Sequence, residues 1–258
     1  MKVAMKKYLQ YIVTDLRNFS KSLDTKSMLV DKPWALIDSD FEIQKLIFKK
    51  NNELILSKDG QVTMGGWEYL PAAKSLLIDR GKDKILCNEG FIDDGVLILK
   101  LDGTKNNFFV LANENMIPDL DAYKYLKELR YRNLNIFTRK LTDGRTLEII
   151  CRENGYDSWI GKEVTFDAEK VEDGIYKFNN YNSKYLIENS CIMAIIHEVE
   201  YKTKDGLTIM VEQKNQYTYR KGENVWVNGK SAPDGNYRVK GGSNFLTKDG
   251  KIFKKSIF

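Results

Sequence analysis

The sequence predicts a mainly β fold, in which a helix-flanked antiparallel meander barrel precedes a duplicated antiparallel β-module. Three observations support this fold class. Asp-Gly dipeptides separate short apolar runs along much of the chain, as they do in series of β-hairpins. Segments with helical spacing flank the first group of these runs. A pattern that begins at Asp143 returns at Asp205.

The chain has 258 residues, which is enough for two ordinary domains. Its hydrophobic fraction of 42% argues against disorder. We expect a first domain over residues 1–135, made of a helix, an eight-strand meander barrel and a second helix. We expect a second domain over residues 136–258, built from tandem copies at about 136–195 and 196–258.

Residues 2–22 are predicted to form an amphipathic helix. Its apolar positions mostly follow helical spacing, and they are Val3, Leu9, Ile12, Val13, Leu16 and Phe19. We expect the helix to dock on its own domain, with a membrane-surface helix as the alternative. The segment lacks the cleavage pattern of a signal peptide, so we expect a cytoplasmic or otherwise intracellular protein. No stretch approaches the roughly 20 apolar residues that span a membrane, so we expect no transmembrane segment.

The Asp-Gly dipeptides are the strongest local signal, because glycine adopts positive φ freely and Asp bonds to nearby backbone. We expect each to mark a hairpin. They are Asp59-Gly60, Asp94-Gly95, Asp102-Gly103, Asp143-Gly144, Asp173-Gly174, Asp205-Gly206, Asp234-Gly235 and Asp249-Gly250.

Residues 34–113 are predicted to form the eight-strand meander. The predicted strands lie near Trp34–Asp38, Gln44–Lys49, Glu53–Ser57, Gln61–Leu70, Lys74–Arg80, Lys84–Cys87, Val96–Leu101 and Asn107–Leu111. Several of these strands are apolar on successive residues, which is typical of strands buried on both faces. We therefore expect the sheet to curl into a barrel or to be covered by helices.

A second helix is predicted after Pro118. Asp119 is its expected N-cap, and Arg130 and Arg132 near its end suit the helix dipole. The expected apolar face is Leu120, Tyr123, Leu126 and Leu129, with Leu134 beyond it.

Residues 136–258 contain an internal repeat. In each copy a Gly-x-x-Val pattern precedes an Asp-Gly-x-Tyr pattern, with eight residues between them. The matched pairs include Asp143 and Asp205, Gly144 and Gly206, Thr146 and Thr208, Gly161 and Gly222, Val164 and Val225, Asp173 and Asp234, Gly174 and Gly235, and Tyr176 and Tyr237. Each copy is expected to close on a strand that ends at Ile192 or Ile252. The sequence leaves open whether the copies form two barrels or one interlocked sandwich.

Two resemblances follow from these patterns. The segment ELILSKDGQVTMGGWEYL, within a meander flanked by helices, resembles lipocalin-like barrels, and pleckstrin-homology-like barrels are the nearest competitor. The pattern VNGKSAPDGNYRV…FLTKDGKI is similar to small β-repeat modules appended to proteins of Bacteroidetes and of their phages. The second resemblance implies a structural or interaction role, without catalytic residues to transfer.

The composition excludes many kinds of catalytic and metal site. His197 is the only histidine, and the three cysteines, Cys87, Cys151 and Cys191, form no Cys-x-x-Cys motif. We interpret these four residues as structural. The spacing Asp38-x-Asp40-x-Glu42 lacks the glycine and distal glutamate of a calcium loop, so we expect a solvated turn there. We therefore predict neither catalytic residues nor a cofactor nor a metal site.

The positive charge is concentrated at the end of the chain. Residues 220–258 hold nine Lys/Arg and three Asp/Glu, whereas the rest of the chain is nearly neutral. If Val225 and Val227 face the core, Trp226 faces outward. The candidate interaction surface is Tyr217, Tyr219, Arg220, Trp226, Lys254 and Lys255. The alternatives are that Trp226 packs against the partner repeat and that the lysines form a solvated edge that discourages strand pairing.

We expect a non-enzymatic structural or interaction protein that works in a larger assembly, with a protein partner or self-assembly. The second resemblance implies a relation to phage proteins. One alternative is binding of a small apolar ligand inside the N-terminal barrel, although Trp34 and Trp67 fit a filled core better than a ligand site. Another alternative is binding of single-stranded nucleic acid through the basic C-terminal repeat.

Overall fold

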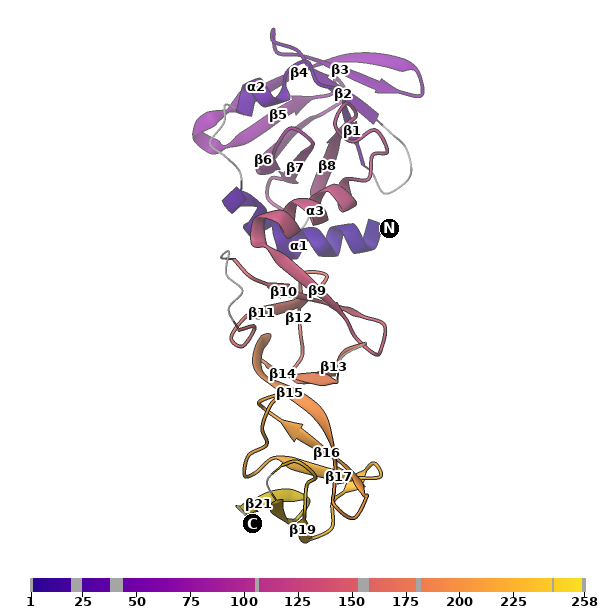
Figure 1. Cartoon of the computed structure of the whole chain (residues 1–258). Coiled ribbons are helices and arrows are strands. Elements are labelled where there is room, and N and C mark those ends of the chain that lie inside the picture. The colour runs from indigo at the N-terminus through magenta and orange to yellow at the C-terminus, as the bar shows by residue number, and fades with distance from the viewer. Residues whose placement is uncertain are drawn as a thin grey trace. The chain divides into compact units, whose positions relative to one another are not determined.

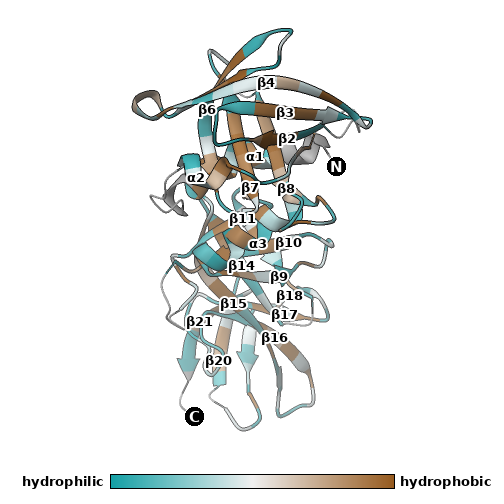
Figure 2. Cartoon of the chain, turned by 90° about the horizontal axis from the view of Figure 1, so that it is seen from above, coloured by the Kyte–Doolittle hydropathy of each residue, from teal (hydrophilic) through white to brown (hydrophobic). Residues whose placement is uncertain are grey.

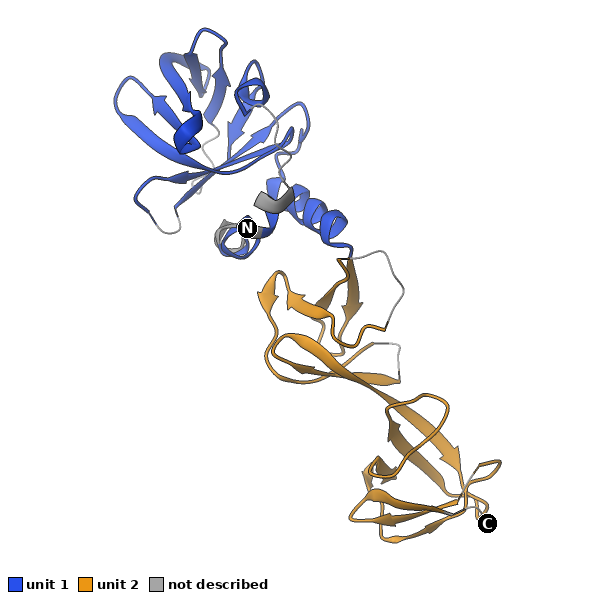
Figure 3. Ribbon diagram, turned by 90° about the vertical axis from the view of Figure 1, so that its left-hand side faces the viewer, with its two compact units in different colours: residues 1–135 blue, residues 136–258 orange. Residues whose placement is uncertain are grey.

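The computed structural model describes residues 2–19, 25–37, 44–104, 107–152, 158–179, 182–242 and 244–256. The chain divides into two compact units, Met1–Asn135 and Ile136–Phe258, which are described separately below (Figure 3). The first unit contains a closed antiparallel barrel, and the second contains another antiparallel sheet. The predicted mainly β fold class is therefore confirmed.

The first unit consists of an eight-strand meander with helices on both sides of it in sequence (Figure 1). Hydrogen bonding between β1 and β8 closes the barrel. The elements are α1 (Lys2–Phe19), α2 (Thr25–Leu29), β1 (Trp34–Leu36), β2 (Gln44–Phe48), β3 (Glu53–Lys58), β4 (Gln61–Leu70), the 3-10 turn η1 (Pro71–Ala73), β5 (Ser75–Asp79), β6 (Lys84–Ile92), β7 (Val96–Leu101), β8 (Phe108–Asn113) and α3 (Ala122–Leu134).

All eight predicted barrel strands are present: β4 and β7 have the predicted ends, five others differ by one or two residues at an end, and β6 differs most. Lys74 closes η1 in the left-handed conformation, with φ of 46°, so β5 begins one residue later than predicted. The strand β6 continues to Ile92 instead of ending at Cys87. A bulge between Glu89 and Phe91 lets this strand bend while it stays paired with β7.

The barrel interior is filled with apolar side chains, which Figure 2 shows as brown segments of the strands. Trp34 and Trp67 both belong to this core, and each indole N–H donates to a backbone carbonyl, of Leu29 and Lys49 respectively, at 3.0 Å. These bonds satisfy the one polar atom of each ring within the fold. The remaining buried members are Met28, Leu29, Leu46, Phe48, Leu54, Leu56, Leu76, Ile78, Cys87, Ile92, Leu97, Leu99 and Leu111.

The N-terminal helix docks within its own unit. The buried residues Leu9, Ile12 and Leu16 recur at helical spacing, and α1 contacts both α3 and β6. The ring of Tyr8 meets the ring of Tyr123 edge-on at 5.1 Å. The observed helix ends at Phe19, and residues 20–22 of the predicted helix lie outside the described residues.

The start of α3 corrects the sequence prediction. Asp121, not Asp119, is the N-cap, because its carboxylate accepts the N–H of Lys124 at 3.0 Å. Asp119 lies outside the helix, where its carboxylate accepts the N–H of Asp121. Leu120 therefore precedes the helix, with φ of 55°. Arg130 is buried near Asp15 of α1, so it does more than neutralise the helix dipole.

A buried polar contact fastens α3 to the barrel. The Tyr125 hydroxyl donates to the Asp93 carboxylate at 2.8 Å, and this carboxylate also accepts the N–H groups of Gly95 and Val96. Burial raises the pKa of Asp93, and the hydrogen bonds oppose that rise. A Cβ at Gly95 would lie 2.6 Å from the Tyr125 ring, so glycine is required for this close approach.

The second unit is a thirteen-stranded antiparallel sheet. Its central path runs β19-β20-β21-β17-β16-β15-β11-β10-β9, with β12, β13, β14 and β18 as side pairings. The strands are β9 (Ile136–Lys140), β10 (Thr146–Ile150), β11 (Glu163–Phe166), β12 (Glu169–Lys170), β13 (Gly174–Lys177), β14 (Ser183–Glu188), β15 (Cys191–Lys202), β16 (Thr208–Gln213), β17 (Asn224–Val227), β18 (Lys230–Ser231), β19 (Gly235–Tyr237), β20 (Asn244–Lys248) and β21 (Lys251–Ser256).

This unit has two separate apolar cores. The buried residues of one lie between Leu141 and Ile192, and those of the other lie between Ile209 and Ile252. Each core therefore draws its buried side chains from one of the predicted copies, which favours tandem packing over an interlocked sandwich. The expected boundary at residues 195 and 196 falls inside β15, which pairs with strands on both sides of it. Ile192 and Ile252 are the second residues of β15 and β21 and do not end strands, contrary to the prediction.

Equivalent backbone hydrogen bonds recur in the two halves of the unit. The pairs, with the earlier bond first, are Leu141 to Arg145 and Thr203 to Leu207; Thr142 to Lys177 and Lys204 to Arg238; Gly161 to Ile192 and Gly222 to Ile252; Val164 to Ser190 and Val225 to Gly250; Asn179 to Lys140 and Lys240 to Lys202; and Ile192 to Lys162 and Ile252 to Glu223. In both halves a tyrosine hydroxyl also donates to a carbonyl four residues earlier, Tyr176 to Glu172 and Tyr237 to Pro233. The two halves therefore share one pattern of hydrogen bonds.

Six of the eight Asp-Gly dipeptides lie in turns between paired strands, as predicted. The other two, at Asp173 and Asp234, precede β13 and β19, which do not pair with the strands before them. Each of these carboxylates accepts a distant N–H at 2.7 Å, that of Asn189 for Asp173 and that of Asp249 for Asp234. The side chain therefore joins a strand start to a remote turn, and it does not form a local hairpin.

Candidate functional site

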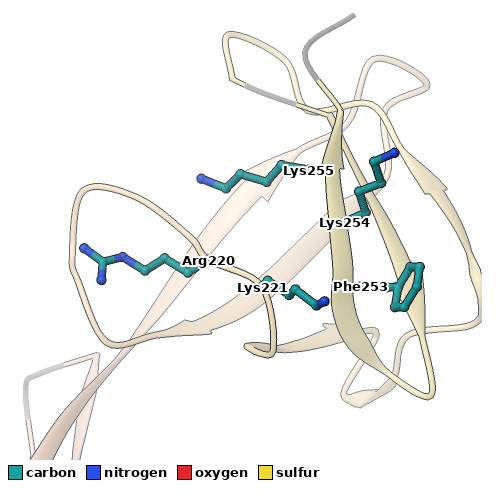
Figure 4. A pocket seen from close by; sticks show the side chains of 5 residues that line it. All are labelled: Arg220, Lys221, Phe253, Lys254 and Lys255. Carbon is teal, nitrogen blue, oxygen red and sulfur yellow. The ribbon is translucent and has the colours of Figure 1, made fainter.

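The main candidate site is a basic notch in the second half of the second unit. We define the basic notch as the residues that line one surface cavity of about 420 Å³: Arg220, Lys221, Phe253, Lys254 and Lys255. Figure 4 shows the first two on the loop between β16 and β17, and the other three on β21. The notch therefore combines two segments that are distant in sequence.

The carboxylate of Glu223 organises the loop side of the notch. This buried side chain accepts the N–H of Lys214 at 2.9 Å and the N–H of Arg220 at 2.6 Å. The loop is also tied to β21, because Gly222 donates to the carbonyl of Ile252 and Ile252 donates to the carbonyl of Glu223. The backbone that carries the notch cations is therefore held at both sides.

A β-bulge presents Phe253 to solvent. Thr247 of β20 pairs with Ile252, and Leu246 pairs with Lys254, so Phe253 is the extra residue of β21. Ile252 is buried, whereas the Phe253 side chain is 51% exposed. The Lys221 ammonium lies 5.4 Å from the centre of the Phe253 ring, which is within the range of a cation–π contact.

The four notch cations have no carboxylate partner among the residues that the structure describes. The Lys255 ammonium lies 4.6 Å from the centre of the Tyr219 ring and 3.3 Å from the hydroxyl of Thr218. Like charges gathered without counter-charges produce a positive potential that attracts anions.

The structure brings together three of the six predicted surface residues in this notch: Arg220, Lys254 and Lys255. Tyr217 lies on the same loop outside the lining and is 84% exposed. Tyr219 is instead buried in the core beneath Lys255, because its ring packs against Phe245 at 5.0 Å.

Trp226 does not project freely outward. It lies on the sheet face opposite Val225, as predicted, but its side chain is only partly exposed and its indole nitrogen is buried. Trp226 pairs with Met210 of β16. Glu212 lies two residues further along β16, on the same face. This position favours packing within the sheet over a free aromatic surface.

Sequence reasoning missed Lys221 and Phe253. Lys221 adjoins Arg220, so its place was available from the charge pattern alone. Strict alternation after Ile252 would place Phe253 on the exposed face, but it does not reveal the bulge that makes Phe253 the extra residue of β21. The signal that could have found it is the repeat, since Met193 occupies the matching bulge position in the first half.

A row of charged and polar side chains crosses five strands on the face that carries Trp226. We call it the charge ladder: Lys177 on β13, Lys184 on β14, Glu198 on β15, Glu212 on β16 and Asn224 on β17. The nitrogen–oxygen distances along it are 2.7 Å for Lys177–Glu198, 2.6 Å for Lys184–Glu198, and 2.8 Å for both Lys184–Glu212 and Asn224–Glu212. Because β13 and β14 belong to the first half and β16 and β17 to the second, the ladder joins the two halves.

The electrostatics of the ladder agree with this geometry. Burial opposes the charge of both carboxylates, yet the lysines hold the pKa values of Glu198 and Glu212 below the ordinary value. Burial likewise disfavours charged Lys184, but its two carboxylate partners raise its pKa. All three groups are therefore stabilised in their charged forms.

The structure places some of the other candidates from the sequence, and the rest lie outside the described residues. Cys87 and Cys151 are buried, and burial raises the pKa of the Cys87 thiol to about 11. His197 lies within β15, between Ser183 and Gln213. The carboxylates of Asp38, Asp40 and Glu42 lie outside the described residues.

Two further findings concern metal binding and membranes. Within the described ranges, no three side chains of His, Cys, Asp or Glu are grouped so that they could hold a metal ion. None of the helices found there is both long enough and apolar enough to cross a bilayer.

No protein-family model, curated protein or solved structure matches the chain significantly.

Proposed function

We propose that this chain is a non-enzymatic interaction protein that works in a larger assembly and binds an acidic partner protein through the basic notch. The observation that carries the proposal is that four cations without carboxylate partners in the described structure line one cavity with the exposed Phe253 ring, and the Lys221 ammonium lies 5.4 Å from the centre of that ring. Aromatic and arginine side chains dominate the energetics of many protein interfaces. A carboxylate-rich surface would complement the notch in charge.

The fixed backbone of the notch supports this proposal. Glu223 and the bonds to Ile252 hold the loop before any partner arrives. A site that is already ordered loses less conformational entropy when it binds. The shared hydrogen bonds of the two halves further support a duplicated module, as in the appended repeat modules that the sequence resembles.

Charge reversal tests the proposal. The Lys254→Glu/Lys255→Glu variant changes two notch cations, and Lys230→Glu/Lys248→Glu makes the same charge change at exposed positions of the same half, outside the notch. Cross-linking and mass spectrometry in the native source should show an acidic partner with the wild type and with the control variant. That partner should be lost with the notch variant.

Two results would contradict the proposal. One is a wild-type protein that stays monomeric and cross-links to no partner in its native source. The other is equal loss of the partner with both double variants, because total charge would then explain binding and the notch would have no special role.

Single-stranded nucleic acid is the second candidate partner, favoured by one observation. Tyr217 is 84% exposed on the loop that carries Arg220, so an aromatic face stands beside a cation. An exposed ring and a cation on one loop can stack a base and contact a phosphate. Oligothymidylate binding should then fall steeply with salt and weaken with Tyr217→Ala and Arg220→Ala. Binding that is insensitive to salt would remove this candidate.

Apolar ligand binding in the barrel gains no support from the described interior. Trp34, Trp67 and their neighbours fill the space between the strands with buried side chains. A filled interior is typical of an eight-strand barrel without a ligand.

A further inference from the structure

We draw no further inference here: the strongest candidate, the exposed apolar surface of Ile160, Ile175 and Met193 in the first half of the second unit, carries nothing because nothing in the described structure shows what covers it.

Discussion

The two halves of the second unit have nearly the same backbone and opposite surface chemistry. Matching bonds from Gly161 and Gly222 place Trp159 and Ile160 where the second half has Arg220 and Lys221. Met193 and Phe253 occupy equivalent bulges and are 49% and 51% exposed. The second half thus has a basic notch where the first half has apolar residues, and Ile160 among them is 52% exposed.

This difference separates the residues that maintain the scaffold from those that vary on it. The two halves share buried positions and backbone hydrogen bonds. Val164 and Val225, for example, are both buried, and the N–H group of each donates at 2.8 Å. The variable part is exposed, so it can change charge with little effect on folding. Binding specificity is therefore expected from the exposed positions and stability from the buried ones.

Truncation of equivalent core residues should have the largest effect. Ile192→Ala and Ile252→Ala each remove a fully buried side chain, so each should cost about 2–5 kcal/mol of unfolding free energy. Because the residues belong to different cores, the double variant should be additive within about 0.5 kcal/mol. Denaturant titration measures both quantities. A clearly non-additive result would mean that the two cores are coupled.

Exchange of a serine between equivalent turns should have the next largest effect. Ser190, with φ of 58°, uses its hydroxyl to bond both backbone groups of Val171. Its equivalent, Gly250, has φ of 71°, and a Cβ there would overlap the Ser231 hydroxyl. Gly250→Ser should therefore cost about 1–3 kcal/mol.

A rescue variant sharpens this test. Gly250→Ser/Ser231→Ala removes the overlap and should recover most of the lost unfolding free energy, again by denaturant titration. Ser190→Gly should cost less than Gly250→Ser, because glycine adopts the positive φ freely while two hydrogen bonds are lost. If Gly250→Ser were neutral, the two turns would be more alike than the structure indicates.

Much of the fold followed from the sequence because it depends on local chemistry. The eight barrel strands were found from apolar runs and turn residues, and six Asp-Gly turns were correct. The errors come from tertiary contacts. Asp173 and Asp234 bond to remote turns, and the bulge after Glu89 prolongs β6 past its predicted end. Neither a hydrogen bond to a remote turn nor a β-bulge can be predicted from sequence periodicity.

The candidate site followed less completely. The charge count located its cations, but burial separated Tyr219 from them, and only the strand register revealed the bulge at Phe253. The charge ladder was not predicted at all, because its members come from five strands and meet only in the folded sheet.

Removal of the central ladder lysine should destabilise the junction between the halves. Lys184→Met leaves the carboxylates of Glu198 and Glu212, which pair directly across β15 and β16, without the cation between them. We expect a loss on the order of 1–3 kcal/mol at neutral pH. Lys177→Met is the matched control. Lys177 forms an ion pair with Glu198 but not with Glu212, and its side chain is more exposed than that of Lys184, so its loss should cost less than about 1 kcal/mol.

The loss from Lys184→Met should depend on pH. Since the folded pKa values of Glu198 and Glu212 lie below the ordinary 4.5, their stabilisation is complete well above that pH and disappears as pH falls through the folded values. The raised pKa of Lys184 means that its contribution is also lost as pH rises past about 10.5. Unfolding free energies of wild type and variant should therefore converge at both extremes, and a constant difference would contradict the ladder.

The smallest stability effects are expected at the two equivalent bulges. Met193→Ser and Phe253→Ser both shorten half-exposed side chains outside the cores, so each should change the unfolding free energy by less than about 1 kcal/mol. Only Phe253→Ser alters the basic notch, and only that variant should weaken capture of the acidic partner in the cross-linking assay. If Met193→Ser weakened capture of the partner equally, binding would depend on the backbone that the two halves share and not on the notch. A large stability loss from either variant would show that the bulge residue belongs to the buried framework and not to the variable surface.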